Sequence, residues 1–188
     1  PNGARPFGVA QLHGGAHKEL MVTYGNGDVG VYLLEGTGPN QAPSLQWSYS
    51  GGVSQRIGIV ALDGIEPKEM LLSNSTNALN PRFEVWRADS TLVGKREFGS
   101  YGSNIGYIVP ADLNNAGSMD FFLTIDDATR DQSDRRRLIS INGDVQTGLF
   151  SEIDNIALAY NGGRVVRAAD LSPVDGIDDA LTWIPGGI

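Results

Sequence analysis

The 188-residue sequence contains no cysteine and only two histidines. The lack of cysteine excludes a disulfide framework, a thiolate metal site and a cysteine nucleophile, although it does not assign a redox compartment. Two histidines without a Gly-x-Ser-x-Gly motif give no local support for a serine triad. His13 and His17 have the four-residue spacing of helical zinc ligands, but Gly14 and Gly15 between them disfavour a helix. We therefore expect no catalytic site.

The sequence also has few basic residues and no long apolar run. Its 14 Lys and Arg residues stand against 22 Asp and Glu residues, for a net charge of −8, which disfavours nucleic acid as a partner. The basic run 135–137 lies beside Asp131 and Asp134, and we expect it at a solvated strand edge. No apolar stretch is long enough for a transmembrane helix, so direct membrane insertion is not expected.

Glycine and turn-forming residues are plentiful. The 25 glycines, together with Asn, Asp and Pro, separate short runs with alternating apolar residues. This pattern is typical of an all-β protein with many tight turns. Asn26 and Gly27 lie between two such runs and predict a hairpin with a type I′ turn; Asn142 and Gly143 predict a second turn.

One segment recurs four times. Each copy has a short β-rich run that closes on a leucine, then a polar loop, an acidic residue and a second apolar run. The four leucines are Leu12, Leu62, Leu113 and Leu171, and the four acids are Glu19, Glu69, Asp120 and Asp179. Spacings of 50, 51 and 58 residues between the leucines indicate a propeller or another repeat array.

Each complete repeat contains four predicted strands, the number found in a propeller blade. The predicted strands of the three complete repeats are 7–12, 19–24, 28–34 and 44–49; 56–62, 69–73, 82–87 and 92–98; and 106–113, 120–125, 136–142 and 145–150. We expect a single partial propeller over residues 1–188, with repeats at about 5–54, 55–104, 105–162 and 163–188.

The fourth repeat contains only two predicted strands, so the chain holds about three and a half blades. Either it is a fragment of a longer polypeptide, which we favour, or another chain completes its open half-blade, since a half-blade leaves an unpaired edge. The first residues lack the apolar core of a signal peptide, and we expect a mature or excised piece.

The loops of the last two repeats carry alternating oxygen-bearing side chains around a central glycine. Such loops can wrap a hard cation, as calcium-binding loops do. They read Asp112-Leu113-Asn114-Asn115-Ala116-Gly117-Ser118-Met119-Asp120 and Asp170-Leu171-Ser172-Pro173-Val174-Asp175-Gly176-Ile177-Asp178-Asp179. The recurring acid has a second interpretation, in which it caps the turn by accepting backbone N–H bonds and needs no ion.

These loops, the β run before them and the repeat period resemble the FG-GAP and VCBS repeats of integrin-α-like β-propellers. The resemblance implies calcium held by Asp112, Asn114, Asp120 and the Ser118 carbonyl, and by Asp170, Ser172, Asp175 and Asp179 in the fourth repeat. Ala116 removes one carboxylate that the family pattern has, and Pro173 stiffens a loop with an inserted residue. The loops of the first two repeats lack the first carboxylate, and we expect metal-free turns there.

Other polar and aromatic residues have ordinary structural interpretations. Adjacent carboxylates at 126–127 and 178–179 point to opposite faces of a strand, which disfavours paired acid–base catalysis. The aromatic residues Trp47, Trp86, Trp183, Tyr32 and Tyr49 are expected between blades, with a sugar-stacking role for one of them as an alternative. Asn74 opens an Asn-Ser-Thr sequon in a predicted loop and is a candidate glycosylation site.

The sequence contains four repeats and no recognisable set of catalytic residues, which favours a non-enzymatic module. The resemblance implies an extracellular or cell-surface protein that binds a protein or glycan ligand, or takes part in an assembly with further blades or neighbouring subunits. Two alternatives stay open: a fragment of a propeller-type polysaccharide lyase or glycosidase, and a structural subunit that completes its open blade with a neighbour.

Overall fold

The fold comes from a computed structural model of the chain. It describes residues 3–14, 16–34, 42–50, 54–62, 67–74, 82–99, 105–115, 120–131, 134–144, 146–158, 164–171 and 175–183. These residues form fourteen β-strands and contain no helix. Accordingly, no helix in the described part of the chain is long and apolar enough to cross a membrane.

The strands form four antiparallel sheets, one for each repeat, with neighbouring strands paired in chain order. The first sheet contains β1 (Arg5–Ala10), β2 (Glu19–Thr23), β3 (Val29–Leu33) and β4 (Ser44–Tyr49). The second contains β5 (Ser54–Val60), β6 (Glu69–Asn74), β7 (Arg82–Trp86) and β8 (Leu92–Glu97). The third contains β9 (Ile105–Ala111), β10 (Asp120–Asp126), β11 (Arg136–Asp144) and β12 (Leu149–Ala157). The fourth pairs β13 (Arg164–Ala169) with β14 (Asp179–Trp183). The predicted all-β fold with blade-like four-stranded sheets is confirmed.

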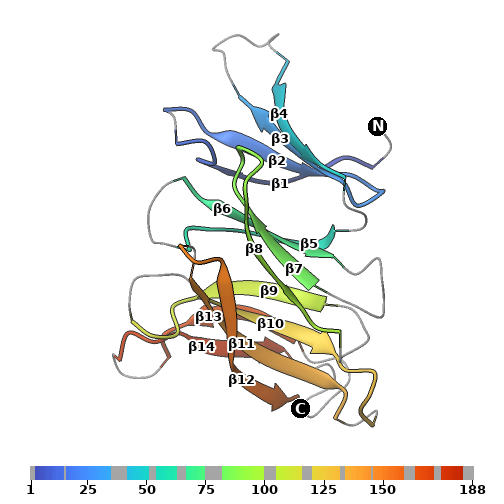
Figure 1. The fold of residues 1–188 in the computed structure, drawn as a ribbon, viewed down its shortest axis with the longest axis vertical. Helices are drawn as coiled ribbons and strands as arrows, with labels where there is room; N and C mark the ends of the chain where they lie inside the picture. Colours follow the sequence, from blue (N-terminus) through green and yellow to red (C-terminus); the bar gives the residue numbers. More distant parts are fainter. Residues whose placement is uncertain are drawn as a thin grey trace.

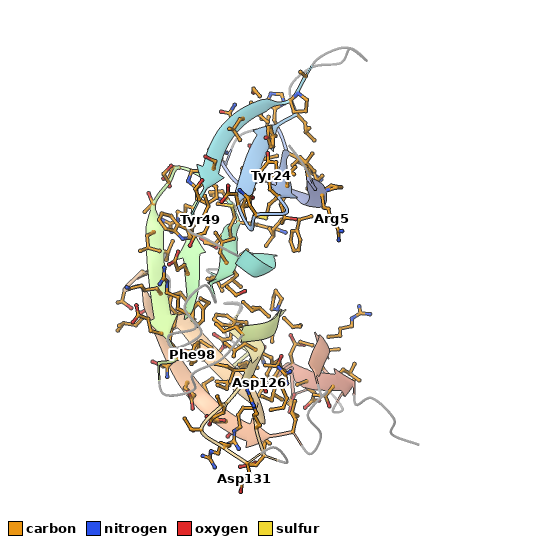
Figure 2. The ribbon with its side chains drawn as sticks, turned by 90° about the vertical axis from the view of Figure 1, so that its right-hand side faces the viewer. Arg5, Tyr24, Tyr49, Phe98, Asp126 and Asp131 are labelled. Carbon is orange, nitrogen blue, oxygen red and sulfur yellow. The ribbon has the colours of Figure 1, made fainter. Side chains whose placement is uncertain are left out.

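The sheets follow one another face to face in chain order (Figure 1). Among the first strands, β9 contacts both β5 and β13, and among the last strands β12 contacts β8. Seen from the side, the four sheets follow an arc, with the first and the fourth sheet at its two ends (Figure 2). No closure of this arc into a ring is present among the described residues.

The seams between the sheets follow one rule of side-chain direction. Residues one and three places after the recurring acid face the preceding sheet, and the residue two places after it faces the following sheet, because side chains alternate along a strand. At these positions the seam between the first and second sheets contains Met21, Met70 and Leu72. The seam between the second and third sheets contains Leu71, Phe121 and Leu123, and the seam between the third and fourth contains Phe122 and Ala180. Each fully buried apolar side chain stabilises its seam by about 1.5–3 kcal/mol.

The structure confirms the first predicted hairpin but corrects its turn. Gly27 N donates to the Tyr24 carbonyl (2.9 Å), Tyr24 N donates to the Asp28 carbonyl (2.9 Å), and Gly27 has φ of 86°. Asn26 does not have positive φ, so the loop is a type I turn followed by a left-handed glycine rather than type I′. Either loop lets the flanking strands pair.

The second predicted turn is wrong. Asn142 and Gly143 lie inside β11, where they pair with Ser151 and Phe150 of β12. The turn comes later, where Gly148 N donates to the Asp144 carbonyl (2.8 Å), and β12 therefore begins at Leu149 rather than at the predicted 145. Asn142 and Gly143 can extend the strand because both residues pair with β12 and donate hydrogen bonds to the Asp120 carboxylate.

The basic run is also not at a sheet edge. Arg136 begins β11, which lies between β10 and β12. The Arg137 side chain is buried and donates to the Asn155 Oδ1 (2.8 Å) and to the Asn155 carbonyl (2.8 Å). Arg137 therefore joins β11 to β12, because the arginine side chain supplies several donors.

Candidate functional site

The recurring acid binds the recurring leucine in every repeat. In each case a carboxylate oxygen of the acid accepts a hydrogen bond from the backbone N–H of the leucine, which lies two residues after the end of the first strand of the repeat. The distances are 2.7 Å for Leu12 N to Glu19 Oε2, 3.0 Å for Leu62 N to Glu69 Oε2, 3.3 Å for Leu113 N to Asp120 Oδ2 and 3.1 Å for Leu171 N to Asp179 Oδ2. We call this contact the acid–leucine clasp. It confirms the interpretation of the acid as a turn cap.

The other carboxylate oxygen of the clasp has a different neighbour in each of the first three repeats. His13 Nδ1 lies 3.4 Å from Glu19 Oε1, and Arg87 Nε lies 3.7 Å from Glu69 Oε1. In the third repeat, Asp120 Oδ1 accepts bonds from Asn142 Nδ2 (2.9 Å) and Gly143 N (3.2 Å). The clasp is thus the common element, while the second contact varies with the side chains that each repeat offers.

Loops of adjacent repeats are joined by a second backbone contact. Lys68 N donates to the Gln11 carbonyl (2.9 Å), and Asp178 N donates to the Asp112 carbonyl (2.7 Å). In both cases the donor is the residue just before the recurring acid of one repeat. The acceptor is the residue just before the recurring leucine of the preceding repeat. The first loop therefore lies beside the second, and the third lies beside the fourth. All four loops connect the first two strands of their repeats, and we call their described residues the loop rim: 11–14, 16–18, 61–62, 67–68, 112–115, 170–171 and 175–178.

The charge of the loop rim changes from one end to the other. The first loop, residues 11–18, contains two histidines and Lys18 and no acid. The fourth loop, residues 170–178, contains Asp170, Asp175 and Asp178 and no base. Lys18, Asp170 and Asp175 are exposed. The rim therefore presents a positive end and a negative end to a binding partner.

The predicted calcium ligands of the third repeat are engaged in hydrogen bonds. Three N–H donors surround the Asp120 carboxylate, and Asp112 Oδ1 accepts from Asn114 N at 3.3 Å. Burial raises the pKa of Asp120, an effect that its bonds with Gly143 and Leu113 oppose. The Asp120 carboxylate thus accepts three hydrogen bonds and acts as a clasp in this arrangement.

The predicted ligands of the fourth repeat are likewise bonded to their own loop. Asp170 Oδ2 accepts from Gly176 N at 3.2 Å, Asp175 Oδ1 accepts from Ile177 N at 3.0 Å, and Asp179 forms the clasp. No three His, Cys, Asp or Glu side chains of the described chain are placed together so that they could hold a metal ion. Ser118 and Ser172 lie outside the described residues, and both calcium sites stay predictions.

The two acidic loops are brought together, which the sequence pattern did not show. Asp112 N donates to Asp178 Oδ2 (2.8 Å), and Asn115 Nδ2 donates to the Asp175 carbonyl (3.3 Å). Gly176 has φ of 75°, which strains a residue with a side chain, and a Cβ there would lie 2.7 Å from the Asn115 side chain, so glycine favours this approach. The third and fourth loops therefore act as one surface.

A second polar site lies at the seam of the first two sheets and was missed by the sequence analysis. Glu84 of β7 is buried and accepts bonds from Arg82 Nε (2.6 Å), Trp86 Nε1 (2.9 Å) and the Tyr49 hydroxyl (3.0 Å). Burial raises the pKa of Glu84, but the bonds from Trp86, Arg82 and Tyr49 outweigh burial and leave this pKa lowered. Tyr49 is reached from 35 positions away, so no local motif could have revealed the contact.

The aromatic residues named from the sequence mostly fill this seam. The rings of Trp47, Tyr49 and Trp86 lie 5.9–6.2 Å from one another, and Trp47 and Tyr49 are buried. Their packing confirms the structural interpretation for these three rings. Tyr32 faces outward from the first sheet and its hydroxyl bonds that of Tyr24. The Trp183 side chain lies outside the described part of the structure.

The remaining candidates have simple placements. Asn74 is the last residue of β6 and pairs with Ser54 and Arg82, so the sequon begins at a strand end and not in a loop. Ser75 and Thr76 lie outside the described residues. His13 lies beside Glu19 and His17 is exposed, and neither belongs to a metal-holding group among the residues that the structure describes.

Comparison with known proteins identifies no family: no protein-family model matches the chain, and no curated protein is found as a relative.

Proposed function

We propose that the chain is a non-catalytic recognition module of FG-GAP/VCBS type whose loop rim binds a protein or glycan ligand in an extracellular or cell-surface setting. The observation that carries the proposal is the backbone contact between loops of adjacent repeats. Lys68 N to the Gln11 carbonyl joins the first loop to the second, and Asp178 N to the Asp112 carbonyl joins the third loop to the fourth, so these loops are paired surfaces rather than independent turns. Binding residues commonly lie on loops that a rigid scaffold positions.

The clasps support a binding role over a catalytic one. Catalysis by carboxylates needs an oxygen that can take or give a proton to a substrate. Instead, each recurring acid uses at least one oxygen to hold its own loop. The acids thereby act as scaffold, and the exposed side chains between them, such as Lys18 and Asp175, are the groups that would contact a ligand.

Kinship with FG-GAP/VCBS propellers is part of the proposal. The four-stranded sheets, the repeat period and the acidic loops of the last two repeats support it. The extracellular setting follows from that kinship, and so does calcium in the third and fourth loops. In such a site Asp112 and Asp170 would supply carboxylate oxygens, while Asp120 and Asp179 would hold the loops through their clasps.

Binding measurements on rim variants test the proposal. The purified chain is screened on a glycan array and on an array of extracellular protein domains, and each hit is measured by calorimetry. Lys18→Glu and Asp175→Lys should weaken the binding of a true rim ligand about tenfold or more, because a charge of the wrong sign opposes it. Lys95→Glu on β8, which lies away from the rim, is the matched control.

Two results would overturn the proposal. One is a ligand whose affinity is unchanged by both rim variants but lost with Lys95→Glu, which would move the site to the outer strands. The other is turnover of a polysaccharide by the chain, which would make it an enzyme.

A further inference from the structure

The same tripeptide occurs in two different structural settings. The sequence contains four Asn–Gly pairs, and two of them, Asn26 with Gly27 and Asn142 with Gly143, lie wholly within the described residues. An aspartate follows each of these two pairs, so the local sequence is Asn-Gly-Asp in both places. A large difference in reactivity between the two pairs must therefore come from the structure around them.

An asparagine followed by glycine can lose its side-chain amide in a reaction with its own backbone. The glycine nitrogen attacks the asparagine Cγ, and the new N–Cγ bond closes a succinimide ring. The Cγ–Nδ2 bond breaks, and Nδ2 leaves as ammonia with the proton that the glycine nitrogen gives up. Water then opens the ring at either carbonyl, which leaves aspartate or isoaspartate. Glycine favours ring closure because it has no side chain and its backbone turns freely.

The third sheet holds Asn142 and Gly143 in an arrangement that opposes ring closure. Both residues lie in β11 and pair with Ser151 and Phe150 of β12. Asp120 Oδ1 accepts from Gly143 N (3.2 Å) and from Asn142 Nδ2 (2.9 Å), and Asp120 is buried. The attacking nitrogen and the leaving nitrogen are thus bound to one buried oxygen. The reaction at this pair requires β11 to separate from β12.

The hairpin between β2 and β3 holds Asn26 by contacts within the turn. Asn26 is exposed, and its Nδ2 donates to Asp28 Oδ2 (2.6 Å) while its Oδ1 accepts from Asp28 N (3.2 Å). Gly27 N, the attacking nitrogen, donates to the Tyr24 carbonyl (2.9 Å). Gly25 precedes Asn26, so the asparagine stands between two glycines. Opening of the turn alone therefore frees the groups that must react.

We propose that Asn26 is a site of spontaneous conversion to aspartate and isoaspartate, and that the fold protects Asn142 from the same reaction. Turns open locally at little cost in free energy, whereas an inner strand such as β11 opens together with its sheet. The Asp28 N–H also polarises the Asn26 carbonyl that the glycine nitrogen attacks. The hairpin follows β2, while the loop rim precedes it, so the site is separate from the proposed ligand surface.

The conversion changes the hairpin in two ways. A carboxylate at position 26 would stand beside the Asp28 carboxylate, where the amide now donates a hydrogen bond, and the two charges repel. Isoaspartate also adds a methylene group to the backbone inside the loop that the bonds between Tyr24 and Gly27 and between Tyr24 and Asp28 close. The loop leads into β3, whose Val29 and Val31 are fully buried in the first seam. Converted chains should therefore melt at a lower temperature than unconverted chains.

Mass spectrometry of the aged chain tests the proposal. The folded chain is kept for days in mildly alkaline buffer, where an amide proton is lost more readily. Samples are then digested, and fragmentation of the peptides assigns the mass gain from NH2 to OH to one position. In the folded chain Asn26 should convert about tenfold faster than Asn142, or more. In urea both should convert at similar rates, because their local sequence is the same.

Asn26→Gln is the control for position. Its side chain would have to close a larger and slower ring, so the mass gain at this position should disappear while Asn142 behaves as in the wild type. Equal conversion of Asn26 and Asn142 in the folded chain overturns the proposal. So does an Asn26 that stays intact in the folded chain while the unfolded chain converts, because the turn would then protect it as β11 protects Asn142.

Discussion

Glu69 and Leu62 form a buried clasp: Glu69 Oε2 lies 3.0 Å from Leu62 N, and the two residues are 0% and 1% exposed. The same contact in the fourth repeat, between Asp179 and Leu171, lies at the surface. The chain thus contains one interaction in a buried and an exposed version. Its contribution to stability should depend on burial, since a buried N–H left without its acceptor cannot turn to water.

Removal of the clasp acid should therefore cost more in the second repeat than in the fourth. Glu69→Ala should lower the free energy of unfolding by about 1–3 kcal/mol, through the unsatisfied Leu62 N–H and the lost packing. Asp179→Ala, the matched control, should cost clearly less. Urea unfolding followed by circular dichroism measures both, and equal losses would contradict the role given to burial.

The lowered pKa of Glu84 predicts a loss of stability in acid. A carboxyl group whose folded pKa lies below its unfolded value of 4.5 stabilises the fold above that value, and the stability is lost as pH falls through the folded pKa. Unfolding free energies of the wild type should fall in this window below about pH 4.5, and Glu84→Gln should remove that part of the pH dependence.

Tyr49→Phe tests how much one of its three donors lowers the pKa of Glu84. It removes one donor to Glu84 while keeping the ring at the seam, so the Glu84 pKa should rise toward its ordinary value. NMR titration of the Glu84 side-chain carboxyl carbon measures the shift. An unchanged pKa in Tyr49→Phe would show that the hydroxyl does not stabilise the carboxylate.

A close backbone approach joins the second and third repeats at Gly94. A Cβ at Gly94 would lie 2.3 Å from the Gly148 carbonyl oxygen and 2.7 Å from the Phe150 ring. Gly94→Ala should destabilise the chain by about 1–3 kcal/mol, because the backbone must move to relieve the overlap. Gly58→Ala, whose Cβ would meet only the Leu71 side chain at 3.4 Å, is the control. A thermal melt in which both variants unfold alike would contradict this account.

Calcium remains a prediction of the loop sequences. If the third and fourth loops bind the ion, millimolar calcium should raise the melting temperature above its value in EDTA, since a ligand bound only by the folded chain stabilises it. Asp112→Asn with Asp170→Asn should abolish the increase. The same melting temperature in calcium and in EDTA would retire both sites and leave the loops supported by their hydrogen bonds without an ion.

The sequence was informative wherever a feature repeats in register. Four acids at nearly constant distance from four leucines predicted the turn cap, and the structure confirms it in all four repeats. It was less informative for single turns. Asn142 and Gly143 carry a turn signal, but the Asp120 carboxylate binds the Asn142 amide and the Gly143 N–H and holds both in a strand.

The sequence by itself determined the all-β class, the four units and the strands within them, because alternation, turn residues and the repeat period act over a few residues or one unit. Only the tertiary structure decided which oxygens are engaged, that the Glu84 network spans two sheets, and that the third and fourth loops meet through Asp112 and Asp178. These contacts join positions 35 and 66 residues apart. Their geometry depends on how the sheets stack, which no local pattern specifies.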